Sequence, residues 1–241
     1  MEEIRINKYL ASLGVGSRRE IDKLIEEGKI RVNGEIISAG VKVTDKDIIE
    51  VKGKKISRDM EKKVYYMLNK PLEVLSSAKD DRGRKTVVDI VKCKERIFPI
   101  GRLDYNTTGL ILLTNDGELF NRVIHPRSEV YKEYYVKVLG EIKDSSIKKL
   151  EDGVELEDGI TLPAYVKLIS REKGKSELMV SIREGRNRQV RRMLEAVNTP
   201  VLVLRRERIG KLSLGKLKVG EYRELTDSEV TVSYTHLRAH E

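Results

Sequence analysis

The sequence predicts an α+β protein with two domains: a small helix-helix-hairpin domain and a larger domain with a mixed, mainly antiparallel sheet and a central cleft. Three observations support this. Helical and then alternating apolar patterns fill the first forty residues, and a polar stretch, KGKKISRDMEKK, follows at 52–63. Beyond it, strand-like and helix-like segments occur in irregular order, not as repeating strand-helix units. The expected boundaries are 1–57 for the first domain, 58–63 for a linker, 64–232 for the second domain and 233–241 for a disordered or non-native tail.

The first domain begins with two short helices. Ile6, Leu10 and Leu13 recur at helical spacing, and the glycines at 14 and 16 end that helix. The second helix starts at Ser17, because Ser17-Arg18-Arg19-Glu20 is a capping box in which hydroxyl and carboxylate satisfy each other's backbone amides. An apolar stripe then runs to Gly28, where the helix is expected to end.

A hairpin follows the second helix. Ile30 and Val32 alternate with basic residues and lead to Asn33-Gly34, the dipeptide most typical of a tight two-residue turn. Weaker alternation continues to Val51, so the expected sheet of this domain is small.

Composition favours a polyanionic partner. The net charge is +9 with a pI near 9.4, and residues 183–218 contain 11 basic and 3 acidic residues, eight of the basic ones arginine. A run of charge is usually a solvated face, but arginine forks match phosphate geometry well, which favours nucleic acid. The single Cys93 excludes an internal disulfide, and it forms no metal cluster with the scattered histidines. The N-terminus is no signal peptide and no segment is long and apolar enough to span a membrane, so we expect a cytoplasmic protein.

The second domain is expected to contain at least four strands and two helices. Strands are expected at 64–68, 110–114, 134–138 and 177–182. A helix capped by residues 115–118 and carrying Leu119, Val123 and Ile124 is expected to end at His125-Pro126. A further helix follows Gln189, because Val190, Met193, Leu194 and Val197 form one apolar stripe. At 100° per residue, Arg191 lies at the edge of this stripe, and the next arginine points away from it.

A polar loop, G-R-L-D-Y-N-T-T-G at 101–109, precedes the apolar strand at 110–114. Read alone, its Asp104 could simply hydrogen-bond its own turn. The segment resembles the signature of the RsuA/RluB family of ribosomal RNA pseudouridine synthases, in which the Asp of G-R-L-D is the catalytic carboxylate. Asp104 is therefore the candidate catalytic residue.

Three later segments extend this resemblance. K-E-Y at 132–134 resembles the family's K-x-Y element, which makes Tyr134 the candidate for stacking on the target base, although a lone strand tyrosine usually fills a core. Residues 184–193, E-G-R-N-R-Q-V-R-R-M, resemble the family's segment whose arginine pairs with the catalytic Asp; here that arginine is Arg191. L-R-R-E-R-I-G matches the closing segment, in which Leu204 would pack against the active site and the arginines would add to the basic surface. One position departs from the family: the usual Lys-Pro-x-Gly reads Lys70-Pro71-Leu72-Glu73, which leaves the geometry of that turn open.

The first domain resembles the S4 RNA-binding domain through R-x-x-K-Y-L-A-x-x-G-x-x-S-R-R and the later V-N-G. The alternative is a helix with ordinary solvated charges. The resemblance implies RNA contact by basic residues of both domains: Arg18, Arg19, Lys23, Arg102, Lys132, Arg186, Arg188 and Arg192.

The resemblance implies a monomeric isomerase that converts uridine to pseudouridine in ribosomal RNA or a pre-ribosomal particle, with no metal, cofactor or membrane. Asn187-Arg188 before Gln189 favours the large-subunit branch over the small-subunit one. The sequence does not decide whether Asp104 attacks the sugar or removes a proton. The main alternative is a non-catalytic RNA-binding or ribosome-assembly factor with the same fold. A DNA-binding regulator would need a recognition helix, and none is convincing here.

Overall fold

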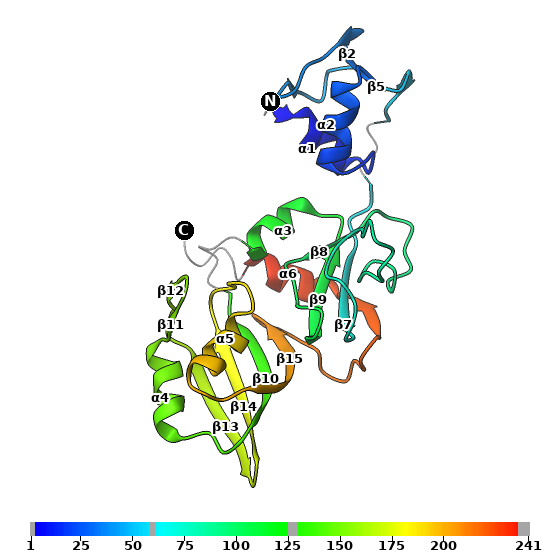
Figure 1. The fold of residues 1–241 in the computed structure, drawn as a ribbon. Coiled ribbons are helices and arrows are strands. Elements are labelled where there is room, and N and C mark those ends of the chain that lie inside the picture. The colour runs from blue at the N-terminus through cyan, green and yellow to red at the C-terminus, as the bar shows by residue number, and fades with distance from the viewer. Residues whose placement is uncertain (1–2, 58–60, 125–129, 236–241) are drawn as a thin grey trace. The chain divides into compact units, whose positions relative to one another are not determined.

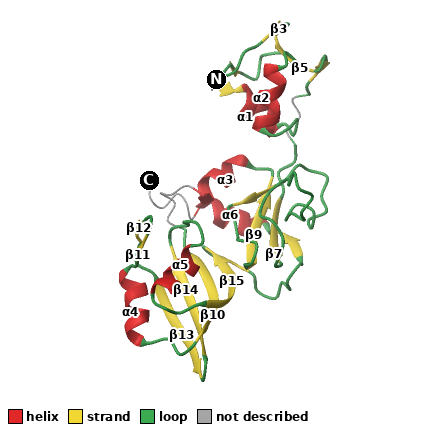
Figure 2. Cartoon of the chain, viewed as in Figure 1, coloured by secondary structure: helices red, strands yellow, loops and turns green. Residues whose placement is uncertain are grey.

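The structure is a computed structural model that describes residues 3–57, 61–124 and 130–235. The chain divides into two compact units. The first contains residues 1–64 with the short segments 93–96 and 115–117, and the second contains 65–92, 97–114 and 118–241. Figure 1 shows the course of the chain, and Figure 2 shows its helices and strands.

The first unit packs two helices against a small sheet. Its elements are β1 (Ile4–Arg5), α1 (Ile6–Ser12), α2 (Arg18–Glu26), β2 (Ile30–Val32), β3 (Glu35–Ile36), β4 (Lys42–Val43), β5 (Ile49–Val51) and β6 (Lys54–Lys55). Four strands form the order β3-β2-β5-β6, and β1 pairs separately with β4. The core consists of aliphatic residues from both helices and the strands: Ile6, Leu10, Ile21, Ile25, Ile30, Val43, Ile49 and Val51.

The capping box and the hairpin turn predicted for this unit are confirmed. Ser17 and Glu20 form both hydrogen bonds of the capping box, and Asn33 and Gly34 take the positive φ angles of a tight hairpin turn. The polar stretch at 52–63 begins with a short strand, β6, which lies within the bounds expected for the first domain. Gly53 reverses the chain, and β6 pairs with β5 as an exposed edge strand, so its lysine-rich composition reflects exposure and not irregular structure.

The second unit is built on a nine-stranded sheet. The main order is β13-β14-β10-β15-β9-β7-β17, and β16 and β8 pair with β15 and β9. The strands are β7 (Tyr65–Lys70), β8 (Phe98–Ile100), β9 (Thr108–Thr114), β10 (Lys132–Leu139), β13 (Tyr165–Glu172), β14 (Lys175–Ile182), β15 (Val201–Ile209), β16 (Leu212–Ser213) and β17 (Tyr222–Glu224). A small hairpin of β11 (Glu155–Leu156) and β12 (Gly159–Ile160) stands apart. All pairings in the main sheet are antiparallel except β15 with β9, which confirms the predicted mixed sheet.

Four helices accompany this sheet: α3 (Gly117–Ile124), which begins in the segment grouped with the first unit, α4 (Asp144–Asp152), α5 (Gln189–Ala196) and α6 (Asp227–Thr235). Helix α5 buries Val190, Met193 and Leu194, as its stripe predicts. The expected stop at His125 lies outside the described residues. Helix α6 extends through residues 233–235 of the predicted tail, and the Ser233 hydroxyl donates to the Glu229 carbonyl within that helix. No helix among the described residues is long and apolar enough to cross a membrane.

One glycine permits the parallel contact between β9 and β15. Gly109 pairs with Arg206 and has a φ of 115°. A Cβ built at this position would lie 2.3 Å from the Arg206 carbonyl oxygen, far inside van der Waals contact. Only glycine therefore allows the two strands to approach at the point where the polar loop at 101–107 joins the sheet.

Candidate active site

A cleft of about 810 Å³ lies in the second unit, in front of the polar loop. Its walls come from the loop after β8, the first half of β10, the segment between β14 and α5, and the centre of β15. The cleft is strongly basic. Its basic lining residues are Arg102, Lys132, Arg183, Arg186, Arg188 and Arg206, and its acidic ones are Asp104 and Glu184.

Asp104 is half-buried at this cleft, on the turn between β8 and β9. The turn is closed by a hydrogen bond from the Thr107 amide to the Asp104 carbonyl at 3.1 Å. Within the described part of the chain, no group donates a hydrogen bond to the Asp104 carboxylate. The carboxylate is thus held by its backbone, and its oxygens are available to a bound molecule.

Two cations behind the loop act electrostatically on Asp104. Lys70 is fully buried at the end of β7, and its Nζ donates to the carbonyls of Pro71 at 2.8 Å and Thr107 at 3.0 Å. Arg191, 7% exposed on α5, donates from Nη2 to the Asn106 carbonyl at 2.7 Å. Burial lowers the pKa of both groups, whereas the charge of Asp104 raises both. Both cations therefore interact electrostatically with the Asp104 carboxylate.

Arg206 supports the same loop from β15. Only 3% exposed, it donates from Nε to the Leu110 carbonyl at 2.7 Å and makes a long contact from Nη1 to the Arg102 carbonyl at 3.5 Å. Arg206 therefore adds to the basic lining of the cleft and is not an exposed surface arginine. Its backbone pairs with Gly109 of β9.

Tyr134 lies on β10, directly across from Arg206 on β15. The tyrosine is 8% exposed and lines the cleft together with Lys132, two residues earlier on the same face of the strand. The pairing of β10 with β15 shifts register between Glu133 and Tyr134, as in a β-bulge. Such irregularities redirect side chains beside functional sites.

The structure brings most of the predicted site residues of this unit to one cleft. Asp104, Tyr134 and Leu204 line it, as do Arg102, Lys132, Arg186 and Arg188. Arg191 reaches the loop from behind, and no ion pair joins it to Asp104 within the described residues. The predicted pairing of Arg191 with Asp104 is thus not seen as an ion pair, and the structure shows only an electrostatic interaction between them.

Two of the predicted RNA-binding arginines have internal partners. Arg192 forms a two-pronged ion pair with Asp158, with both distances 2.9 Å. Arg186 donates to Glu184 at 2.9 Å and to the carbonyls of Gly159 and Ile160. These arginines fix the β11–β12 hairpin to the base of α5, so neither presents an unused guanidinium to a ligand.

Lys70 and Arg206 are the site residues that sequence reasoning missed. Their partners Thr107 and Leu110 are 37 and 96 residues away, so no local pattern reveals them. The only available signal was the Lys-Pro dipeptide itself, since a lysine that ends a fully apolar strand needs a buried carbonyl or carboxylate.

The turn after Lys70 keeps a glycine-like conformation without glycine. Glu73 has a φ of 59°, and its amide donates to the Tyr105 carbonyl at 2.9 Å. In this conformation a residue with a Cβ raises the free energy of the folded state by roughly 1–2 kcal/mol. Glycine avoids this strain, but part of the gain is lost because glycine makes the unfolded chain more flexible. Glu73→Gly should therefore raise the free energy of unfolding by up to about 1 kcal/mol. Urea denaturation measures it, and Glu73→Ala, which keeps the Cβ, should show no comparable gain.

Lys70 should also make stability depend on pH. Burial lowers its pKa from 10.5 to about 8, with Asp104 opposing the shift. Between these values the unfolded chain binds more protons than the folded one, so Lys70 makes the free energy of unfolding rise with pH. Lys70→Met should therefore reduce the slope of stability against pH from about 8 to 10.5, measured by urea denaturation. Lys167→Met, which removes an exposed lysine of β13, should leave the slope unchanged.

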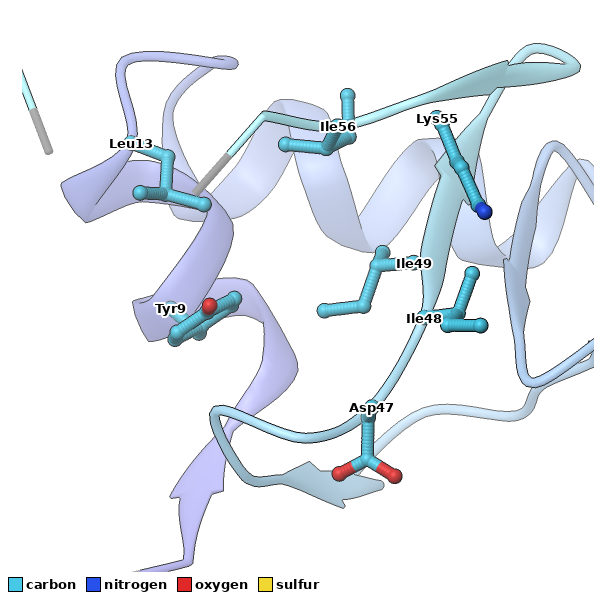
Figure 3. A pocket seen from close by; sticks show the side chains of 7 residues that line it. All are labelled: Tyr9, Leu13, Asp47, Ile48, Ile49, Lys55 and Ile56. Carbon is cyan, nitrogen blue, oxygen red and sulfur yellow. The ribbon is translucent and has the colours of Figure 1, made fainter. Parts of the chain in front are cut away.

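The first unit contains a second cavity of about 190 Å³ (Figure 3). Tyr9, Leu13, Ile49 and Ile56 are among the residues that line it. The Asp47 carboxylate at its edge accepts hydrogen bonds from Thr44 and Asn33 and so serves the turn before β5. We therefore regard the cleft around Asp104 as the candidate active site. Among the residues described, no group of three or more His, Cys, Asp or Glu side chains could hold a metal ion.

The basic residues predicted to bind RNA in the first unit lie on α2. Arg18, Arg19 and Lys23 are exposed, whereas Ile21 and Ile25 are buried. Arg19 and Lys23 lie on the side away from the isoleucines, and Arg18 is the first residue of the helix. Lys23 makes only a long, exposed ion pair with Glu27, at 4.0 Å. The three cations therefore face solvent.

Known proteins share both units. The profile of the RNA pseudouridylate synthase family matches residues 64–196, and that of the S4 domain matches residues 4–49. A Bacillus subtilis protein named ribosomal large subunit pseudouridine synthase B is 50% identical over 230 residues, which cover 94% of this chain and 93% of that one. A Shigella flexneri protein named dual-specificity RNA pseudouridine synthase RluF is 38% identical and covers 94% of this chain and 77% of that one. A crystal structure described as a pseudouridylate synthase aligns with a TM-score of 0.68 and 31% identity, over 95% of this chain and 99% of that one.

The fold and the cleft thus define an isomerase that acts on RNA. The chain belongs to the RNA pseudouridine synthases, in the RsuA/RluB group that carries an N-terminal S4 domain.

Proposed function

We propose that this protein converts a specific uridine of large-subunit ribosomal RNA to pseudouridine, with Asp104 as the catalytic carboxylate. The observation that carries the proposal is the position of Asp104: a half-buried acid at a basic cleft, near Lys70 and Arg191. The choice of the large subunit is supported by the name of the Bacillus subtilis relative. Such a substrate would place the protein in the cytoplasm, where it would act as a monomer.

The chemistry requires the N-glycosidic bond to break, the uracil to turn and a carbon-carbon bond to form at C5. A carboxylate can attack the sugar or remove a proton from it. Hydrolysis of the same bond would ordinarily use a second carboxylate and an admitted water. Among the described residues, the only other acid that lines the cleft is Glu184, which accepts hydrogen bonds from Leu162, Gln189 and Arg186. This arrangement favours isomerisation over hydrolysis.

Tyr134 would stack on the target base. A uridine in structured RNA must leave its helix to reach Asp104, and an aromatic ring offsets part of the lost stacking. Leu204, 5% exposed on β15, would provide an apolar wall beside this ring. The cleft is far larger than one base, so neighbouring nucleotides would enter with it.

Basic residues of both units would hold the RNA backbone. In the second unit these are Arg102, Lys132 and Arg188, which line the cleft. In the first unit they are Arg18, Arg19 and Lys23, which would give the S4 domain its affinity. Arg186 and Arg192 would act indirectly, by fixing the hairpin beside the cleft.

Loss of the exposed arginines of α2 should weaken RNA binding without stopping catalysis. Arg18→Gln with Arg19→Gln should lower the affinity for substrate RNA and reduce the slope of log affinity against log salt by about 2. The pseudouridylation rate at saturating RNA should stay nearly constant. Filter binding at several salt concentrations measures the slope. The matched pair Lys54→Gln and Lys55→Gln, on the exposed strand β6, should have a smaller effect.

The function is tested by mapping pseudouridines in ribosomal RNA from cells with and without this protein. One or a few uridines should lose the modification when the protein is absent and regain it when purified protein is added to the RNA. An unchanged map with an altered yield of assembled subunits would instead support the alternative, a non-catalytic assembly factor.

A further inference from the structure

Two cations, Lys132 and Arg206, lie next to Tyr134 and take no part in the bond rearrangement described above. We propose that Lys132 and Arg206 together bind one backbone phosphate of the RNA, adjacent to the nucleotide that stacks on Tyr134. This inference rests on the proposed function, because it takes the ligand of the cleft to be RNA.

The sheet register places the two side chains on either side of the tyrosine. Tyr134 pairs with Arg206 across β10 and β15, and Lys132 lies two residues before Tyr134 on the same face. All three line the cleft. A base on the Tyr134 ring would therefore have its own sugar-phosphate backbone within reach of both cations.

Arg206 has donor capacity that the protein does not use. Its Nε is bound to the Leu110 carbonyl and its Nη1 makes the long contact to Arg102. Its Nη2 is buried and has no hydrogen-bond partner within the described residues. A buried guanidinium nitrogen without an acceptor costs free energy, and an incoming phosphate oxygen would supply that acceptor.

Lys132 also lacks a dedicated counterion. Its Nζ makes one long hydrogen bond, 3.4 Å to the Val130 carbonyl. Burial and the charge of Arg206 lower its pKa to about 8, and Glu184 acts in the opposite direction. Glu184 is shared among three other donors, so it neutralises Lys132 incompletely. The two cations thus repel each other in a half-buried place, and an anion between them would remove this cost.

A phosphate diester fits this pair better than a carboxylate or a free base would. The described residues that line the cleft include six basic and two acidic side chains, so its potential attracts an extended polyanion. A planar guanidinium and a point-charge ammonium can grip two oxygens of one phosphate from different sides. Arg102 and Arg188, which line the same cleft, would serve the next phosphates along the strand.

The proposal is tested with the variant Lys132→Gln. Lys132 makes no short hydrogen bond within the described protein, so removal of its ammonium group should leave the fold intact. In a fragment of ribosomal RNA that the wild-type protein pseudouridylates, the variant should bind about tenfold more weakly. Its slope of log affinity against log salt should fall by about 1. Lys167→Gln, on exposed β13 outside the cleft, is the matched control and should change neither value. Arg206→Lys is a second variant, expected to bind more weakly than wild type because an ammonium cannot reproduce the fork.

A neutral linkage identifies the phosphate. In a series of RNA fragments, each linkage around the target nucleotide is replaced in turn by a methylphosphonate on a 2′-deoxy sugar. At one position, this replacement should weaken the binding of the wild-type protein about as much as Lys132→Gln does. At that position, the variant should show no further loss.

Equal sensitivity of the wild-type and Lys132→Gln proteins to every neutral linkage, or an unchanged salt slope, would overturn the proposal. These outcomes differ from a failure of the proposed function, in which the wild-type protein forms no pseudouridine in the RNA at all.

Discussion

Asp104→Asn should abolish pseudouridine formation, with a fall in rate of about a thousandfold or more, because the loss of a nucleophile or base removes the reactive group itself. The amide nearly matches the carboxylate in size, and the carboxylate accepts no hydrogen bond within the described protein, so the loop should keep its shape. RNA affinity should change by less than about threefold, since the backbone is held by other residues. The rate is measured as tritium release from RNA labelled at C5 of uridine.

The matched control for this prediction is Asp152→Asn, which changes an exposed acid on α4 that forms an ion pair with Lys148. It should leave the rate unchanged. A normal rate of tritium release from Asp104→Asn would refute the role of Asp104. A large loss of RNA affinity in the same variant would mean that the carboxylate acts mainly in shaping the cleft.

Features set by neighbouring residues could be predicted from the sequence. The capping box of α2 joins residues three apart, and the hairpin turn needs only Asn33-Gly34. The burial of Arg191 at the edge of the α5 stripe also follows from helical spacing. Each of these depends on interactions within one or two turns of chain, where periodicity carries the information.

The arrangement around Asp104 could not be derived in this way. Lys70 and Arg206 become buried because strands β7 and β15 flank β9, and this order of strands is a long-range property. The resemblance to a known family supplied Asp104 and Tyr134, but it gave no reason why the loop is held rigidly. That reason is physical: buried cations from three separate elements bind carbonyls of the loop and of the strand that follows it.

Gly109→Ala should be among the most destabilising single substitutions in the second unit, and it tests this account of the loop. The added Cβ would lie 2.3 Å from the Arg206 carbonyl oxygen and 2.4 Å from its amide nitrogen. Both are backbone atoms in the β9–β15 pairing, so no side chain can rotate away to relieve the overlap. With the cost of a positive φ added, we expect a loss of about 3–5 kcal/mol in the free energy of unfolding, measured by urea denaturation.

Gly140→Ala separates the two causes of this loss. Gly140 also has a positive φ, 83°, but no heavy atom within 4 Å of the position of an added Cβ. Its substitution should cost only about 1–2 kcal/mol, the backbone contribution alone. The difference between the two variants therefore measures the steric contact of β9 with β15. If both variants lose the same stability, the strands can separate at little cost, and the rigid support inferred for Asp104 is wrong. If Gly109→Ala alone loses several kcal/mol and its residual folded protein is also inactive, the contact that brings Arg206 to the loop is required for catalysis as well as for the fold.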